Sequence, residues 1–396
     1  MNILIFNCGS SSQNFKVYSV LEGQSPAVIA SGKARNVATR TKAEPQIDWR
    51  VGDDEGSRKV DLSTHRQAAE ENLRVLVEHT MQIDAVGHRF VHGAEWFQAT
   101  TRITASSMET LKKCFRLAPI HNPNSFSVIE VCTEQLPGVP QFVVFDTSFH
   151  SKLPPEATRY ALPLELASEH GFRKYGFHGL SYSFVSQRAA LLLNRPLESV
   201  KLIMCHLGTG GSSVAAFKDG HSVETSMGYS PLPGLVMSTR CGDIDPEILL
   251  ELFREGLGAD EISEILNNRS GLIGLSGFSS NLEEVITEGE NGNEDCRIAA
   301  DVYANRLKTY LGGYFWLLDG ADAIVFTDSV GTRSWKMREK VCGNVEKLGI
   351  LLDTEKNRAA RVDKETFVNQ ALSEAAIIVI PTDEELVILN EVLRAL

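Results

Sequence analysis

The chain has 396 residues, of which 43% are apolar and 23% are charged, and its formal net charge is −12. One hydrophobic core seldom serves a chain of this length, so we expect two domains in a globular protein. The acidic balance argues against nucleic acid or an anionic membrane as a partner. No apolar run reaches the roughly 18 residues of a membrane-spanning helix, and the first residues lack a signal-peptide pattern. We therefore expect a cytoplasmic protein.

The seven cysteines are scattered, odd in number and never in a C-x-x-C pair. This pattern predicts reduced thiols rather than disulfides or a zinc site. Cys8 and Cys241 lie inside glycine-bearing motifs, where we expect sensitivity to oxidation. The other five are expected to be small buried side chains.

A strand–turn–strand pattern opens the chain and returns about two hundred residues later. Residues 3–6 and 15–20 read as strands around a small-residue turn at 7–12, and residues 202–205 and 214–217 flank a similar turn at 208–213. Two copies of one plan predict a duplicated domain with a cleft between the copies.

Helices and strands alternate along the rest of the chain. Helical spacing is found at 68–79, 182–193 and 298–318, and Asp245-Pro246 opens a further helix at 247–255. Strands are expected at 141–145, 323–327 and 375–380, with a closing helix after Glu385. Residues 51–58 and 287–295 are polar and read as exposed loops. The mixture predicts an α/β fold.

Two small-residue turns could hold phosphate, because backbone N–H groups and hydroxyls at strand ends form anion-binding cradles. The first spans residues 7–12 and the second residues 208–213. An ordinary hairpin turn is the alternative for the first. The chain has no G-x-x-x-x-G-K-[ST] sequence, so it is not a P-loop protein.

Charged side chains stand near these turns or at strand ends. Arg89, between two histidines, could bind a carboxylate bidentately or form a structural ion pair. Asp146 follows a buried strand, where a carboxyl group usually has a function or a partner. Arg240 is the lone arginine of a polar loop at 224–246.

The lone histidines His121 and His178 are each more often structural than catalytic. Together with the two arginines, Asp146, the pair Glu384-Glu385 and the turns, however, they suit phosphoryl transfer between anions. That reaction needs positive groups around the phosphoryl group, an acid for Mg²⁺ and close backbone approach.

Ten motifs between Asn7 and Glu384 resemble, in order and spacing, those of the acetate kinase family. They are N-x-G-S-S-S, G-H-R-x-V-H-G, A-P-I-H-N-P, F-D-T-x-F-H, Y-G-F-H-G, H-L-G-x-G, T-S-M-G, T-R-x-G-D-I-D-P, S-G-L-x-G-x-S-G and P-T-x-E-E-L. The resemblance implies the duplicated actin/hexokinase/Hsp70-like (ribonuclease H-like) fold and usually a homodimer. We expect one domain at 1–146, joined by the C-terminal helix at about 385–396, and the other at 147–384.

The resemblance also implies residue roles. Arg89 would bind the acetate carboxylate, His178 and Arg240 would stabilise the transferring phosphoryl group, and Asp146 would be the catalytic acid. Because acetate is already ionised at neutral pH, we expect Asp146 to position Mg²⁺ or a neighbouring cation rather than abstract a proton. The remaining implied positions are His121 in the same site, Asn7 and Glu384 at Mg²⁺ (or Mn²⁺), and Val91, Ile120, Phe177 and Pro231 in the acyl pocket.

The nucleotide side departs from the family pattern. The family's first-turn lysine is Asn14 here, and Lys16, two residues along, is expected to point elsewhere. Thr209 replaces an asparagine, Glu283 replaces an arginine, and Asp328 enters the adenosine-side loop. The positions expected on this side are Ser10, Ser12, Asn14, His206, Gly208, Thr209, Gly210, Gly211, Asn281, Glu283, Asp328, Gly331 and Arg333.

A minor branch of the family exchanges phosphate with pyrophosphate and carries H-L-G-T-G-G-S-S and F-T-D, both of which this chain has. We therefore favour acetate/acetyl phosphate with pyrophosphate/phosphate over ATP/ADP. Arg333 would then bind the distal phosphate or remain a solvated surface residue. Two alternatives stay open: an ordinary ATP-dependent acetate, propionate or butyrate kinase, and a non-catalytic actin-like binding protein.

Overall fold

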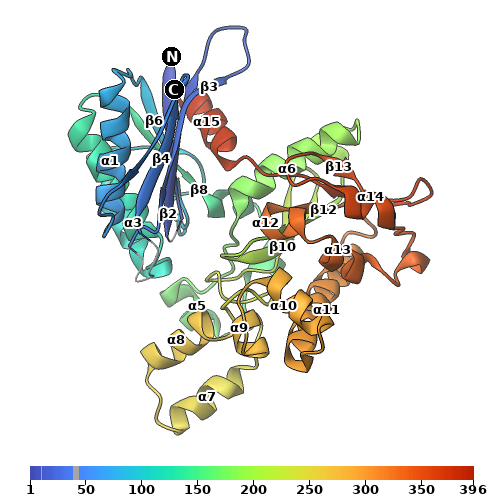
Figure 1. Ribbon diagram of the computed structural model, residues 1–396. Coiled ribbons are helices and arrows are strands. Elements are labelled where there is room, and N and C mark those ends of the chain that lie inside the picture. The colour runs from blue at the N-terminus through green and yellow to red at the C-terminus, as the bar shows by residue number, and fades with distance from the viewer. Residues whose placement is uncertain (10, 39–43) are drawn as a thin grey trace. The chain divides into compact units, whose positions relative to one another are not determined.

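The computed structural model describes residues 1–9, 11–38 and 44–396. The chain divides into two compact units. Unit 1 consists of Met1–Ser148 with Asp383–Leu396, and unit 2 of Phe149–Thr382 (Figure 1).

Unit 1 is built on a sheet of eight described strands in the order β5-β4-β3-β2-β1-β6-β8-β7. The strands are β1 Asn2–Cys8, β2 Ser12–Ser19, β3 Ala27–Arg35, β4 Gln46–Val51, β5 Asp54–Lys59, β6 Ala85–Phe90, β7 Thr101–Arg102 and β8 Gln141–Phe145. The helices are α1 His65–Glu78, α2 Ala105–Lys113, α3 Asn122–Gln135 and α15 Glu384–Ala395.

Different helices pack on the two faces of this sheet. Leu4 and Phe6 of β1 pack in one core with Leu73 of α1 and Val128 of α3, and Figure 1 shows these helices on one side and α15 on the other. On the α15 side Gly87 of β6 has no side chain, and a Cβ there would lie 2.8 Å from carbons of Ile5, Ile388 and Val392. The missing side chain thus lets α15 pack closely on β6.

Unit 2 is built on a second sheet, with described strands in the order β11-β10-β9-β12-β14-β13. The strands are β9 Leu202–Leu207, β10 Ser212–Lys218, β11 His221–Thr225, β12 Ala323–Thr327, β13 Thr366–Phe367 and β14 Ala376–Val379. The helices are α4 Pro155–Thr158, α5 Leu164–His170, α6 Gly179–Leu192, α7 Pro246–Arg254, α8 Ala259–Asn268, α9 Gly271–Ser276, α10 Leu282–Glu290, α11 Glu294–Leu317, α12 Asp328–Arg333, α13 Trp335–Cys342 and α14 Thr354–Ala359.

In unit 2, alternate side chains of β9 and β12 point to opposite faces of the sheet and belong to two hydrophobic cores. Met204 and Val325 pack with Val185 of α6, whereas Ile203 and Ile324 pack with the α11 side. The sheets share one topology: the antiparallel hairpin β1–β2 is followed by the parallel strands β6 and β8, and β9–β10 by β12 and β14. The predicted α/β class and duplicated strand plan are confirmed.

Most predicted elements are present with shifted ends. The strands at 141–145 and 323–327 match β8 and β12, and Asp245 caps α7 by accepting a hydrogen bond from the Glu247 amide at 2.9 Å.

Two predicted loops are wrong. Residues 54–59 form β5, an edge strand paired with β4, because an edge strand keeps polar side chains in water. Residues 287–290 continue α10, and α11 begins at Glu294 after the cap Asn293.

Two further expectations concern membranes and thiols. Across residues 1–9, 11–38 and 44–396, no helix combines the length and apolarity that crossing a bilayer requires. All seven cysteines are free thiols, as predicted. Burial raises the pKa of Cys8 to about 12, so the expectation that this thiol is sensitive to oxidation is wrong.

Candidate functional site

Arg89 is the centre of a buried polar cluster in unit 1. It lies near the end of β6, beside the ends of the neighbouring parallel strands β1 and β8. Its Nη2 is 2.7 Å from Asp146 Oδ2, its Nη1 is 3.0 Å from Glu384 Oε2, and Nη1 also donates to Asn7 Oδ1 at 3.0 Å. Burial lowers the pKa of Arg89, but the charges of Asp146 and Glu384 outweigh it and raise the pKa. The guanidinium therefore stays charged.

The start of α15 completes this cluster. Asn7 Nδ2 donates to Glu384 Oε2 at 3.1 Å and to Glu385 Oε1 at 3.0 Å. Lys16 Nζ lies 3.0 Å from Asp383 Oδ1 and 3.4 Å from Glu385 Oε2. One cation, Lys16, thus holds the two carboxylates that flank Glu384.

The expectation that Lys16 points elsewhere is wrong. Residues two apart in a strand share a face, so Lys16 emerges on the face of Asn14, which pairs with Asn7 across β1 and β2. Local sequence could not reveal this contact, because Asp383 and Glu385 come from the far end of the chain.

The oxygens of this cluster fit Mg²⁺. The amide oxygen Oδ1 of Asn14 is buried and has no hydrogen-bond partner within the described part of the chain. Asn7 and Glu384 add an amide and a carboxylate oxygen nearby. The described residues contain no metal-binding group of three or more His, Cys, Asp or Glu. Mg²⁺ usually takes only one or two carboxylates, with water and substrate phosphate completing its shell.

The remaining site positions predicted in unit 1 belong to the acyl pocket and to the first turn. Val91 follows β6 and is buried, His121 is the cap residue of α3, and Ile120 is 53% exposed. In the first turn the Gly9 amide donates to the Ser12 carbonyl at 2.9 Å. Ser10 lies outside the described residues. The remaining acyl-pocket positions, Phe177 and Pro231, belong to unit 2.

In unit 2 the glycine-rich turn between β9 and β10 faces two nitrogen-bearing side chains. The Gly208 amide closes the turn by donating to the Gly211 carbonyl at 3.1 Å. A Cβ on Gly211 would lie 3.3 Å from Arg240 Nη1 and 3.4 Å from His178 Nε2, whereas one on Gly210 would meet nothing within 4 Å. Arg240 Nη1 and His178 Nε2 therefore both lie close to Gly211, where only a glycine leaves them room.

Arg240 has no carboxylate partner among the described residues. Its Nη1 donates to the Pro231 carbonyl at 3.3 Å and lies 4.0 Å from the Met237 sulfur. Burial lowers its pKa, with no opposing charge to raise it. A half-buried guanidinium without a counter-ion is a site for an anion.

His178 is held in a specific orientation. It has a left-handed φ of 58°, uncommon for a non-glycine residue, and immediately precedes α6. Its Nδ1 lies 2.8 Å from Ser213 Oγ, and its ring stacks on that of His206 with centroids 4.0 Å apart. The carbonyl of the buried Phe177 is 3.0 Å from His150 Nε2.

The first residues of α12 close onto the glycine-rich turn. Asp328 Oδ2 lies 3.2 Å from His206 Nε2, and a Cβ on Gly208 would be only 2.2 Å from that carboxylate oxygen. The Thr209 amide donates to Ser329 Oγ at 3.2 Å. Side chains of the protein thus occupy part of the space against the turn.

Three other nucleotide-side positions have different surroundings. Asn281 caps α10 by accepting a hydrogen bond from the Glu283 amide at 3.0 Å, which gives Asn281 a structural role. Gly331 is buried in α12, and Arg333 at its end is exposed.

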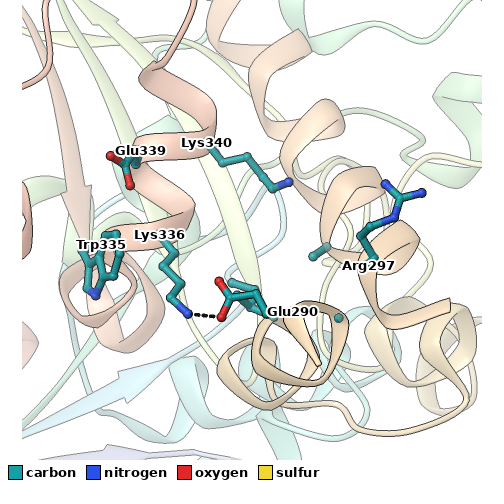
Figure 2. Close-up of a pocket in the computed structure, with 9 residues that line it drawn as sticks. Glu290, Arg297, Trp335, Lys336, Glu339 and Lys340 are labelled. Carbon is teal, nitrogen blue, oxygen red and sulfur yellow. Dashed lines mark hydrogen bonds and ion pairs between the residues drawn. The ribbon is translucent and has the colours of Figure 1, made fainter. Parts of the chain in front are cut away.

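A cavity of about 390 Å³, which the sequence did not reveal, lies among α10, α11 and α13 (Figure 2). Ile286 and Trp335 line it, and Lys336 Nζ pairs with Glu290 Oε2 at 2.6 Å beside them. Its lining residue Ile286 lies three residues after Glu283 in α10, which is about one helical turn. Its volume lies within the range of small-molecule sites.

Replacing Lys16 by Met should lower the free energy of unfolding by about 2 kcal/mol, because Glu385 loses its cation in a mostly buried place. The charges of Glu385 and Asp383 outweigh burial and raise the pKa of Lys16 above its ordinary 10.5. Its contribution is therefore fully present below pH 10.5 and is lost as pH rises through the folded-state pKa.

Urea unfolding at several pH values measures this difference. Lys33→Met, which removes an exposed lysine of the neighbouring strand β3, is the matched control. A Lys16→Met deficit no larger than that of Lys33→Met at pH 7 would show that the pairing contributes nothing.

Comparison with known proteins identifies the family. Residues 2–390 match the model of the acetokinase family. The acetate kinase of Dictyoglomus thermophilum is 43% identical over 405 aligned residues, covering 100% of this chain and 99% of that protein. The crystal structure of acetate kinase from Entamoeba histolytica has a TM-score of 0.89 at 38% identity, covering 100% of this chain and 99% of the other.

A propionate kinase from Francisella tularensis also has a TM-score of 0.89, at 35% identity and 98% coverage of both chains. The match thus extends over nearly the whole sequence and both units. The chain therefore belongs to the acetokinase family, phosphotransferases that use a carboxyl group as acceptor.

Proposed function

We propose that this enzyme catalyses Mg²⁺-dependent phosphoryl transfer between acetate and pyrophosphate, forming acetyl phosphate and phosphate, and the reverse reaction. The observation that carries the choice of pyrophosphate is the closure of Asp328 and Ser329 onto the glycine-rich turn. A carboxylate in this place opposes the phosphates of a nucleotide and takes space that they would need. A small inorganic donor needs less of that space.

In the proposed reaction Arg240 and His178 donate hydrogen bonds to the oxygens of the transferring phosphoryl group. The uncompensated charge of Arg240 supports this role, since negative charge there is stabilised without displacing another anion. A carboxylate oxygen of acetate bonds to phosphorus while the bridging P–O bond breaks, and phosphate leaves with that electron pair. No proton has to be removed from acetate.

Arg89 would bind the acetate carboxylate. The other positions proposed for the acyl substrate are His121, Val91 and Ile120 in unit 1 and Phe177 and Pro231 in unit 2. The contact of Arg89 with Asp146 supports the interpretation that Asp146 orients a cation rather than acting as a base. Mg²⁺, held by Asn7 and Glu384 with Asn14 as a further oxygen donor, would offset phosphate charge. Mn²⁺ has similar ligand preferences.

A second candidate is an ATP-dependent acetate or propionate kinase. The cavity beside α10 and α13 favours it, because about 390 Å³ could receive part of a nucleoside. The Lys336–Glu290 ion pair argues against this candidate, because it lies in the cavity wall and places charged groups where an apolar base would bind (Figure 2). The non-catalytic binding protein is not retained, because the chain belongs to a family of phosphotransferases.

We also propose that the protein acts in the cytoplasm as a homodimer, without nucleic-acid or membrane partners. The amphipathic helix α7 supports the dimer: it has no buried residue, and Ile248, Leu250 and Phe253 are each about half exposed. The predicted domains at 1–146 with 385–396 and at 147–384 remain part of this proposal.

The donor is tested with purified protein, acetyl phosphate and Mg²⁺, supplied with either phosphate or ADP. We expect pyrophosphate from the first mixture and little or no ATP from the second. Asp328→Ala/Ser329→Gly should raise ATP formation, because it removes the side chains that close onto the turn. ATP formation by the unmodified protein, with no pyrophosphate, would establish the nucleotide-dependent reaction instead.

Arg240→Ala should reduce kcat by about three orders of magnitude, equivalent to about 4 kcal/mol of transition-state stabilisation. Arg361→Ala, which removes an exposed arginine paired with Asp363, is the control for loss of one positive charge. Steady-state kinetics and a melting curve for each variant separate catalysis from folding. Wild-type turnover in a folded Arg240→Ala protein would remove Arg240 from the mechanism.

Ile248→Asp/Phe253→Asp should convert the dimer to a monomer, because it places two charges on the apolar face of α7. Sedimentation velocity measures the mass, with Leu372→Asp, another exposed leucine, as control. If the unmodified protein is a monomer, or the double variant remains a dimer, α7 is not the dimer contact.

A further inference from the structure

Strand β10 places two adjacent buried hydroxyls on opposite faces. Ser213 Oγ lies 2.8 Å from His178 Nδ1 and 2.5 Å from the Tyr182 hydroxyl. Ser212 Oγ lies 3.3 Å from the Gly208 carbonyl and 3.4 Å from the Tyr303 hydroxyl. Of the two serines, Ser213 is the one that contacts the ring of His178.

The proton positions in the Tyr182–Ser213–His178 chain follow from its chemistry. Burial raises the pKa of Tyr182 well above its ordinary value, so its side chain is a neutral phenol. A buried hydroxyl has to donate its proton, and Ser213 Oγ is the acceptor beside it. Ser213 then donates its own proton to His178 Nδ1. The neutral ring consequently carries its N–H at Nε2.

The Nε2 atom of His178 lies beside Gly211 of the glycine-rich turn. A Cβ on Gly211 would lie 3.4 Å from it and 3.3 Å from Arg240 Nη1. Both nitrogens therefore lie next to the same glycine, in the place that the proposed function assigns to the transferring phosphoryl group.

We propose that Ser213, supported by Tyr182, is a positioning residue that fixes the Nε2–H tautomer of His178 and directs this N–H at the transferring phosphoryl group. The identity of the ligand rests on the proposed function, but the hydrogen-bond chain does not.

The same chain opposes a second proton on His178. Nδ1–H would have to donate to Ser213, which already accepts from Tyr182, and the serine proton would lose its acceptor. Further charged or titratable groups of unit 2 around the ring are Arg240, which also opposes a second positive charge, and His206, which is stacked on it and paired with Asp328. Loss of the Ser213 hydroxyl removes the hydrogen-bond part of this opposition.

Ser213→Ala should therefore reduce kcat by about tenfold, with the KM for acetyl phosphate nearly unchanged. The acidic limb of the kcat–pH profile should move to higher pH by roughly one unit. ¹⁵N NMR of labelled histidine, which does not depend on substrate, should show a single Nε2–H tautomer of His178 in the unmodified protein and a mixture in the variant.

Ser212→Ala is the matched control, because it removes the neighbouring hydroxyl, and it should keep the pH profile and the tautomer. Tyr182→Phe removes only the end of the chain and should give a smaller change in the same direction. It also tests the proposal if Ser213→Ala does not fold. An unchanged tautomer and pH profile in the folded variants would overturn the proposal. Absence of turnover in the unmodified protein would refute the proposed function, while the NMR result would still decide the role of Ser213.

Discussion

The arrangement of polar side chains depends on one constraint, the repeated order of an antiparallel hairpin followed by parallel strands. Parallel strands end at the same edge of a sheet, and adjacent ladders fix which side chains emerge together there. In unit 1 this edge carries Asn7, Arg89 and Asp146. In unit 2 it carries His206 and Asp328. One backbone plan thus gives each unit a polar edge with its own chemistry.

The charge balance of the two edges differs. In unit 1 the two cations Arg89 and Lys16 face the carboxylates of Asp146, Asp383, Glu384 and Glu385. Negative charge is in excess there, which suits a divalent cation. In unit 2 Arg240 has no carboxylate partner among the residues described, which suits an anion.

The side chains against the glycine-rich turn bear on which donor is used. Glycines allow a phosphate to approach the backbone, yet Asp328 and Ser329 already contact this turn. The cavity is separate from this turn: residues of α10, α11 and α13 line it, and the Lys336–Glu290 pair borders it. Contact at the turn favours a small donor, whereas the cavity leaves room for a larger one. This opposition makes donor choice the central functional question for this member of the family.

The sequence alone determined the family, because ten motifs in one order resemble those of acetate kinases. It also determined the α/β class and most elements, because strand and helix periodicity, caps and turn residues are local signals. Asp245 at the start of α7 and the strands β8 and β12 are examples. It could not determine that Lys16 pairs with Asp383 and Glu385, or that Ser213 contacts His178, because these partners are distant in the chain. The sequence also predicted a loop where the polar edge strand β5 lies, because that strand depends on its pairing with β4. Only the tertiary structure decided which charges are compensated, since that depends on how strand ends and the start of α15 meet in space.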